Sequence, residues 1–208
     1  MSIPQADLDR AKQTAYKQFA KIKVATDVSR KTMEQVIVKA QQTMKNNGMA
    51  TVTRLLQTEA DQPTLDAFAS SMQATIQSFT AAMAKLQVTD GLLKTLTNAD
   101  VKIEAAKTSD LVAQCVADMQ AGFLEYQQGY NDAMQIFTTN QALGGPMTRE
   151  DQEALNAKIN LVVQASVDKI NARLPASQAI TVMETDTDGD GVVDTVSVDN
   201  GVGSAGSE

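Results

Sequence analysis

Apolar residues recur every three or four positions over most of the chain, which is the spacing of an amphipathic α-helix. The first series follows Ser2, Pro4 and Gln5, whose types and spacing are typical of a capped helix start. Its apolar members are Leu8, Ala11, Ala15, Phe19, Ile22, Met33, Val36, Ala40 and Met44. The Asn-Asn-Gly sequence at 46–48 then predicts the end of a helix roughly 60 Å long, at ~1.5 Å per residue.

A second series is the most regular in the chain, because it keeps a heptad spacing without interruption. Asp61 and Pro63 mark its start. Its members are Leu65, Phe68, Met72, Ile76, Phe79, Met83 and Leu86. Heptads are typical of helices that pack lengthwise against other helices. Asp90-Gly91 and residues 98–100 then punctuate the sequence, which predicts an irregular connector up to Thr108 with a short helix over 92–96.

Two more long helices are expected after this connector. The first starts at Asp110 and ends at Gly144-Gly145-Pro146. Its apolar stripe contains Val112, Val116, Met119, Phe123, Tyr126, Tyr130, Ala133 and Phe137, so both tyrosines are expected in the core or at its rim. The second starts with a capping box at Thr148 and Asp151 and ends at Pro175.

The pattern changes after Pro175, where β-branched residues flank a cluster of Asp and Gly. These residues are Ile180, Val182, Val192, Val193, Val196 and Val198, and they predict a small β-hairpin. The expected fold class is therefore mainly α, an elongated bundle of about four long amphipathic helices with a small C-terminal hairpin and loop unit. The expected organisation is a helical domain over 1–175, the hairpin unit over 176–200, and a flexible tail over 201–208.

Composition weighs against an enzyme. The chain has no His and no Trp, a single Cys and 4% aromatic residues. Without His it lacks the usual general base near neutral pH and the Ser/His and Cys/His pairs of nucleophilic catalysis. An enzyme would then need a metal-carboxylate site. Cys115 lies in an apolar helical pattern and is expected to act as a small hydrophobic residue.

Charge is unevenly distributed about a net value of −7. Residues 1–54 contain ten Lys/Arg against four Asp/Glu, and residues 55–208 contain eight against twenty-one. This asymmetry suggests a chain that is electrically polar from end to end and suited to repeated head-to-tail contacts between copies. The acidic balance argues against nucleic acid as a partner, whereas the basic amphipathic helix leaves contact with a membrane surface open.

Targeting signals are not evident in the sequence. The first residues lack the apolar core of a secretion signal, and no stretch approaches the ~18 apolar residues of a membrane span. The expectation is a soluble protein made without an N-terminal signal peptide.

The sequence DTDGDGVVD at 186–194 is the motif that carries chemistry. Carboxylates occupy positions 1, 3, 5 and 9 of this loop, at Asp186, Asp188, Asp190 and Asp194. Calcium prefers six to eight oxygen ligands, and a chain that turns around it presents alternate side chains inward. Gly191 permits the sharp turn, and the Val192 carbonyl would be a further ligand. The alternative is a hairpin turn that is rich in Asp and Gly for turn chemistry alone.

These residues resemble the EF-hand-like loops of dockerins and of other bacterial and extracellular calcium-binding repeats. The resemblance covers about twelve residues and implies calcium binding by Asp186, Asp188, Asp190, Val192 and Asp194. The sequence departs from the EF-hand pattern at position 12, where Ser197 replaces a bidentate Glu, and its flanks look extended rather than helical. Weak affinity is expected unless Glu184 or Asp199 completes the shell.

The function that fits these features is a non-enzymatic structural or assembly protein that forms a homo-oligomer or part of a larger assembly. A loop of ~10⁻⁴–10⁻³ M affinity would fill outside a cell and stay empty in a cytosol, so the expected place of action is outside the cytoplasm. A phage particle component or a component of a secretion machine has such a role. The alternative is a secreted helical effector or membrane-active protein.

Overall fold

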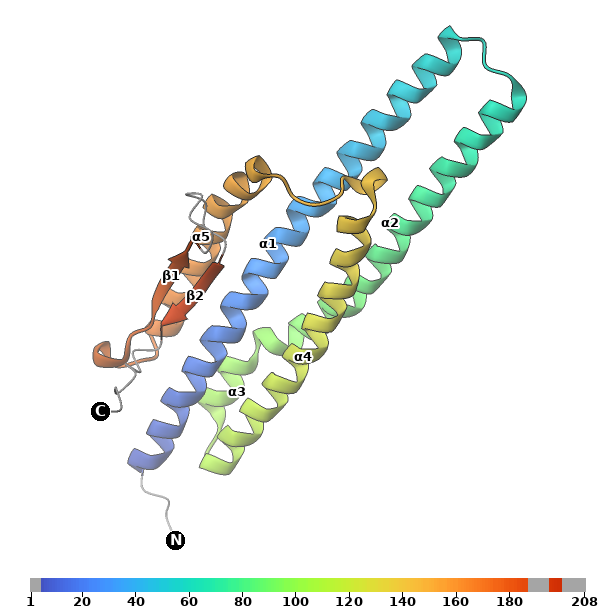
Figure 1. Ribbon diagram of the computed structural model, residues 1–208. Coiled ribbons are helices and arrows are strands. Elements are labelled where there is room, and N and C mark those ends of the chain that lie inside the picture. The colour runs from blue at the N-terminus through green and yellow to red at the C-terminus, as the bar shows by residue number, and fades with distance from the viewer. Residues whose placement is uncertain (1–4, 187–194, 200–208) are drawn as a thin grey trace, which may run out of the picture.

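The computed structural model describes residues 5–186 and 195–199, and these residues form a mainly helical protein, as the sequence predicts. Four long helices and a small antiparallel hairpin make up the described part (Figure 1). The helices are α1 (Gln5–Gln57), α2 (Gln62–Thr97), α3 (Ala99–Ala105), α4 (Ser109–Thr139) and α5 (Arg149–Asn171), with short 3-10 turns η1 (Gln141–Leu143) and η2 (Ala176–Gln178). The strands are β1 (Thr181–Thr185) and β2 (Thr195–Asp199).

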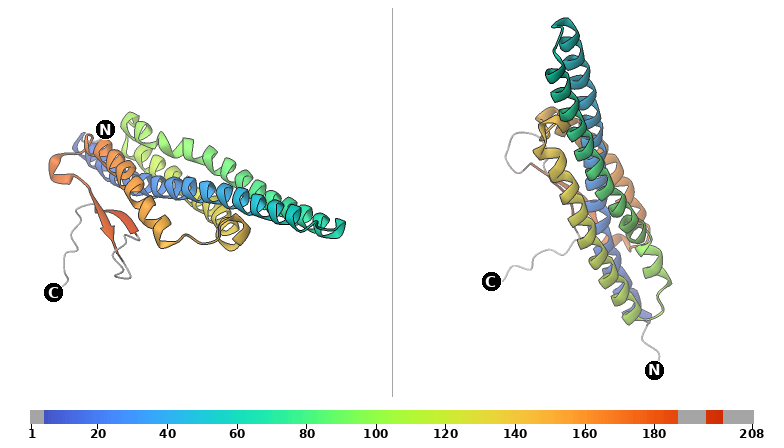
Figure 2. Two further views of the ribbon diagram at one scale, coloured as in Figure 1. Left: turned by 90° about the horizontal axis from the view of Figure 1, so that it is seen from above. Right: turned by 90° about the vertical axis from the view of Figure 1, so that its right-hand side faces the viewer.

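Helix α1 is the axis around which the other elements pack. It contacts α2, α3, α4 and α5 as well as β2 and η1. Helix α2 returns antiparallel to α1, and both helices extend well past the ends of α4 and α5 (Figures 1 and 2). The projecting part, residues 44–76, is called the tip below.

The expected helix end at 46–48 is wrong, because α1 continues to Gln57. Gly48 lies against α2, and a Cβ added there would be 2.9 Å from the Met72 Cε atom. The glycine therefore allows a close approach of two helices, at a cost of only about 1 kcal/mol in helix propensity. A contact with a residue far along the chain overrides the local stop signal.

The expected irregular connector after Asp90-Gly91 is also wrong over most of its length. Helix α2 passes through this pair to Thr97, and α3 follows almost at once. Thr89 is buried and lies directly against Gly129 of α4, which fixes α2 in place at this point. Asn98 then breaks the helix between α2 and α3.

Local capping explains where the later helices begin. The Asp61 carboxylate accepts a hydrogen bond from the Thr64 backbone N–H at 3.0 Å and caps α2. Hydrogen bonds from the Thr64 hydroxyl and backbone lower the pKa of Asp61. The capping box predicted at Thr148 and Asp151 is confirmed at the start of α5. The cap expected around Ser2 lies outside the described residues.

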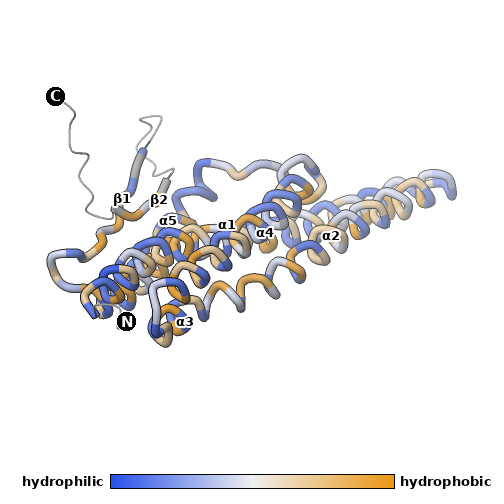
Figure 3. The backbone as a smooth tube through the Cα atoms, turned by 90° about the horizontal axis from the view of Figure 1, so that it is seen from below, coloured by the Kyte–Doolittle hydropathy of each residue, from blue (hydrophilic) through white to orange (hydrophobic). Residues whose placement is uncertain are grey.

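The core has two parts. The larger lies between the N-terminal half of α1 and helices α3, α4 and α5, and it contains Tyr126, which is buried as expected. The smaller joins α1, α2, α4 and η1 around Phe137. Apolar positions nevertheless continue along both helices into the tip, beyond either core (Figure 3).

The expected end-to-end charge polarity is wrong, because α1 runs the length of the molecule and carries its basic residues along it. The asymmetry is instead lateral, between α1 and the elements packed on it. Lys39 Nζ on α1 contacts the Asp151 carboxylate of α5 at 2.6 Å. Attraction between unlike segments therefore acts mainly within one chain.

Asp151 supports a prediction about stability and pH. Burial disfavours its ionisation, but hydrogen bonds from Lys39 and from Thr148 outweigh this effect and lower its pKa below 3.8. A lowered pKa stabilises the fold above the unfolded-state value, and the contribution is lost as pH falls through the folded-state value. Asp151→Asn is expected to lower the free energy of unfolding by about 1.5 kcal/mol at pH 7, as measured by urea denaturation.

The matched control for this prediction is Glu150→Gln, an exposed neighbour in the same helical turn. It is expected to change the free energy of unfolding by less than about 0.5 kcal/mol. The loss in the Asp151 variant should shrink as pH falls through the lowered pKa of the folded wild type, where its carboxylate also becomes neutral. A loss that stays constant down to pH 2 would contradict the ionic explanation.

Candidate functional site

The tip is the part of the molecule that is least covered by the rest of the chain. Helix α4 ends at Thr139, and only η1 follows it toward the base of the tip. The two helices of the tip therefore form a ribbon with two faces. The front face is the side on which α4 and η1 lie, and the back face is the opposite side.

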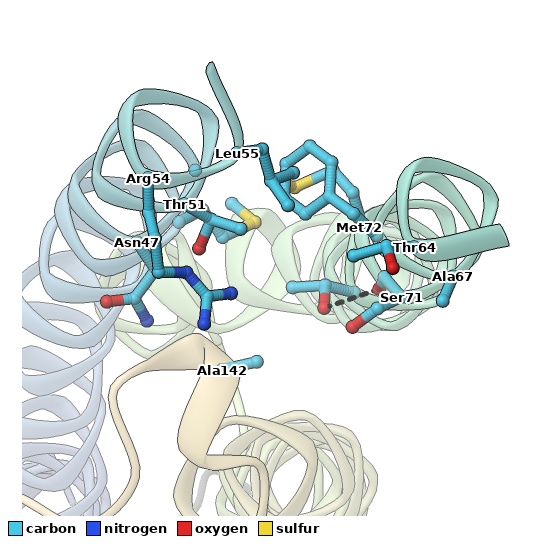
Figure 4. Close-up of a pocket in the computed structure, with 13 residues that line it drawn as sticks. Asn47, Thr51, Arg54, Leu55, Thr64, Ala67, Ser71, Met72 and Ala142 are labelled. Carbon is cyan, nitrogen blue, oxygen red and sulfur yellow. Dashed lines mark hydrogen bonds between the residues drawn. The ribbon is translucent and has the colours of Figure 1, made fainter. Parts of the chain in front are cut away.

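The front face carries a pocket of about 400 Å³ between α1 and α2, lined by both polar and apolar side chains (Figure 4). Asn47 and Arg54 extend from α1 on the side of Ala142, whereas Leu55 and Met72 lie toward the opposite side of the ribbon. The polar residues that line the pocket are Asn47, Thr51, Arg54, Thr64, Ser71 and Thr75.

The back face is apolar and exposed. On α1 it contains Met49, Val52 and Leu56, which are 62%, 44% and 76% exposed. Their spacing of three and four places them on one stripe, about half a turn away from Asn47 and Arg54.

Helix α2 completes this apolar face. It adds Leu65 and Ile76, which are 39% and 52% exposed. A shallow pocket of about 270 Å³ opens between the two helices near the turn, lined in part by Val52, Leu56 and Leu65. The back face therefore offers five large apolar side chains to a partner.

The heptad stripe of α2 packs against other helices of the bundle over only part of its length. Its inner members, such as Phe79 and Met83, pack on the smaller core, where the Phe79 and Phe137 rings meet edge to face at 6.0 Å. Its outer members lie beyond the end of α4 and receive no third helix. Only the inner part of the heptad stripe is therefore buried against other helices of the same chain.

Two charged residues flank the apolar stripe of α1. Lys45 precedes Val52 by seven residues, and Glu59 follows it by seven. Both side chains are exposed, and neither forms an ion pair with any of the described residues. The back face therefore has a basic end near the bundle and an acidic end near the turn.

Comparison with known protein families, curated proteins and solved structures gives no match for this chain. Within the described ranges, no helix has both the length and the apolar character that crossing a bilayer requires.

The predicted calcium loop lies almost entirely outside the described residues. Asp186 is described and exposed, directly after β1, whereas Asp188, Asp190, Val192 and Asp194 lie in the undescribed range 187–194. In residues 5–186 and 195–199, no three Asp, Glu or Cys side chains gather closely enough to hold a metal ion. The hairpin itself is confirmed, with β1 and β2 antiparallel.

The register of the hairpin bears on which residues could complete a calcium shell. Thr185 pairs with Thr195, so the two ends of the loop are neighbours. Glu184 and Val196 form the adjacent pair, which places Glu184 beside the loop. Asp199 pairs with Thr181 at the opposite end, roughly 13 Å away at ~3.3 Å per residue. The register therefore favours Glu184 over Asp199.

A polar cluster in the larger core has a structural explanation. The buried Asp27 carboxylate accepts hydrogen bonds from Lys23 Nζ and from the Ser166 hydroxyl, both at 2.5 Å. These contacts join α1 to α5. Burial raises the pKa values of Tyr126 and Tyr130 to about 12, so both phenols stay protonated near neutral pH.

Sequence reasoning missed the apolar residues that follow Gly48, because it ended the first helix there. The signal was present, since Met44 is followed by Gly48, Thr51 and Leu55 on the inner face and by Met49, Val52 and Leu56 on the outer face. Two stripes on one helix indicate contacts in two directions.

Proposed function

We propose that this protein is a non-enzymatic structural subunit that assembles with other protein through the back face of the tip. The observation that carries the proposal is the exposed apolar stripe of Met49, Val52 and Leu56 on a helix pair that projects past its own bundle. Exposed apolar side chains gathered on one face are typical of interaction sites, whereas scattered ones are ordinary. Burial of each such side chain contributes about 1.5–3 kcal/mol.

The length of the tip also supports an assembly role. An extension of this kind exposes two helices along most of their surface, which stabilises the monomer little. Beyond Met44, which packs on the smaller core, it adds no residue to either core. A projecting helix pair of this shape is well suited to insert between neighbouring subunits of an assembly.

Sedimentation velocity of the full chain over a hundredfold dilution series tests this proposal. The expected result is an average sedimentation coefficient that rises with concentration, as reversible association requires. A coefficient that stays at the monomer value across the series would overturn self-assembly as the function.

The C-terminal hairpin supports a second part of the proposal, in which calcium clamps the loop between β1 and β2. Four closely spaced carboxylates repel one another without a cation, and the paired ends of the hairpin close the loop on itself. The donor set fits calcium through Asp186, Asp188, Asp190, Asp194 and the Val192 carbonyl. The clamp would hold β2 against α1, which β2 contacts.

Asp188→Ala tests the calcium clamp. Removal of one carboxylate is expected to weaken calcium binding at least about tenfold, measured by isothermal titration. Millimolar calcium is expected to protect residues 180–200 from protease in the wild type and not in the variant. Asp168→Ala, a carboxylate on α5, is the matched control and should bind calcium as the wild type does. Equal affinity in all three proteins would contradict the clamp.

Weak calcium affinity leads to a proposal on location. A loop that fills only at millimolar calcium works outside a cytosol, as in a phage particle or after export by a dedicated secretion machine. Full occupancy at sub-micromolar calcium in the same titration would contradict this proposal.

The competing function is a secreted membrane-active protein that lays the same apolar stripe on lipid, with Lys45 near the headgroups. Co-sedimentation with vesicles of anionic and neutral lipid separates the two proposals. Binding to vesicles together with a constant monomeric sedimentation coefficient would favour the membrane role.

A further inference from the structure

We infer that the partner of the back face is the same face of a second copy, antiparallel to it, with a two-fold axis that passes beside Val52. This inference rests on the proposed assembly function and names the partner. It is carried by the order of exposed residues around Val52, because a two-fold interface must be complementary to itself.

The exposed residues of α1 are arranged symmetrically about Val52. Met49 lies three residues before it and Leu56 four residues after it. In an antiparallel pair that crosses at Val52, Met49 of each copy meets Leu56 of the other. The central Val52 side chains then meet each other across the axis.

Charges have the same symmetry. Lys45 lies seven residues before Val52 on α1, roughly 10 Å away at ~1.5 Å per residue, and Glu59 lies seven residues after Val52, in the turn just past the helix end at Gln57. The antiparallel arrangement therefore brings each Lys45 to the Glu59 of the other copy, and it does so twice. Neither residue forms an ion pair within the described part of its own chain, so both charges can pair across the interface.

Helix α2 repeats the pattern at the same level. Gly48 faces Met72 and the helices run antiparallel, so Val52 lies level with a point near residue 68. The exposed pair Leu65 and Ile76 has its midpoint between residues 70 and 71. One axis therefore places Leu65 of each copy opposite Ile76 of the other.

The parallel arrangement of two tips is less favourable. It would place the acidic turns side by side, with Glu59 and Asp61 of both copies at the same end of the interface. Like charges in such proximity repel, whereas the antiparallel arrangement pairs unlike charges. The charges therefore favour the antiparallel arrangement of the two apolar stripes over the parallel one.

The size of the contact predicts a reversible dimer. Two helices, each ~10 Å wide, present roughly 400 Å² per copy over a ~21 Å overlap. This is smaller than the standard interface of ~800 Å² per partner. The dimer is therefore expected to dissociate on dilution, and repeated contacts in an assembly would strengthen it.

Cysteine crosslinking tests the position of the axis. Val52→Cys in a Cys115→Ala background is expected to form a covalent dimer with a short bis-maleimide, because a residue beside a two-fold axis meets its own copy. Ala50→Cys is the matched control, since it is exposed on the same helix but points about 200° away. The Val52 variant is expected to crosslink at least about tenfold faster.

A charge exchange tests the orientation. Lys45→Glu and Glu59→Lys are each expected to weaken self-association roughly tenfold, since each places like charges together at two sites. The double variant, which restores unlike pairs, is expected to return within about twofold of the wild type. Circular dichroism spectra that match the wild type establish that all three variants are folded.

The outcomes separate this inference from the proposed function. A wild type that self-associates, together with equal crosslinking at positions 50 and 52 or no rescue by the double variant, would overturn the two-fold pairing and leave the assembly function standing. A wild type that stays monomeric in the dilution series would overturn both.

Discussion

The double substitution Met49→Asp and Leu56→Asp is expected to weaken self-association by more than 100-fold, in sedimentation velocity over the same dilution series. The loss is large because a two-fold interface contains each residue twice. The variant removes four buried apolar side chains and places four carboxylates in the contact. Apolar burial contributes about 1.5–3 kcal/mol for each side chain, so a loss of at least ~3 kcal/mol is expected.

The control for this prediction adds the same charges to the other face of the same helix. Asn47→Asp with Ala50→Asp is expected to leave self-association within about threefold of the wild type, since both side chains point away from the back face. Stability should change little in either variant, because all four positions are exposed. Equal weakening by the two variants would show that net charge, and not the apolar stripe, governs association.

Phe137→Ala is expected to lower the free energy of unfolding by about 4 kcal/mol, measured by urea denaturation at pH 7. The ring has no exposed surface and contacts Phe79 of the α2 heptads edge to face. It lies in the smaller core, which joins α1, α2, α4 and η1 at the base of the tip. Its removal leaves a cavity where the tip emerges from the bundle.

Phe68→Ala is the matched control for this prediction. The chemical change is the same, but Phe68 is only half-buried, in the tip. Removal of the Phe68 ring is expected to lower the free energy of unfolding by less than about 1.5 kcal/mol, since less apolar surface returns to water and no closed cavity forms. A similar loss of unfolding free energy in both variants would contradict the division of the molecule into a bundle with a packed core and a weakly packed tip.

Sequence periodicity predicted the elements whose information is local. The heptads from Leu65 to Leu86 and the capping box at Thr148 both correspond to helices in the structure. The alternating Val196 and Val198 likewise lie in strand β2 of the antiparallel hairpin. In these segments, propensity, apolar pattern and turn chemistry favour the same structure.

The sequence-based predictions fail where a contact with a residue far along the chain determines whether a helix continues. Gly48 and Gly91 both suggested helix ends, yet α1 and α2 pass through them. At Gly48 the reason is the approach of Met72, which lies on another helix and leaves no trace in the local pattern. The charge asymmetry was detected correctly, but its direction in space depends on how far α1 extends.

The candidate sites differ in how far sequence could locate them. The loop from Asp186 to Asp194 was visible as a motif, because calcium ligands follow a fixed spacing. The back face was not visible in this way, since an apolar stripe is the same in sequence whether a neighbour covers it or not. The three-dimensional arrangement shows that no other described element covers Met49 and Leu56, which are 62% and 76% exposed.

Oxidative footprinting of methionine over a range of protein concentrations tests the central claim most directly. Met49 lies in the proposed interface and is 62% exposed, and Met183 on β1 is 46% exposed and serves as an internal control. The account predicts that oxidation of Met49 by dilute hydrogen peroxide slows as concentration rises, while oxidation of Met183 keeps its rate. A Met49 rate that stays constant relative to Met183 at every concentration would contradict assembly through the back face.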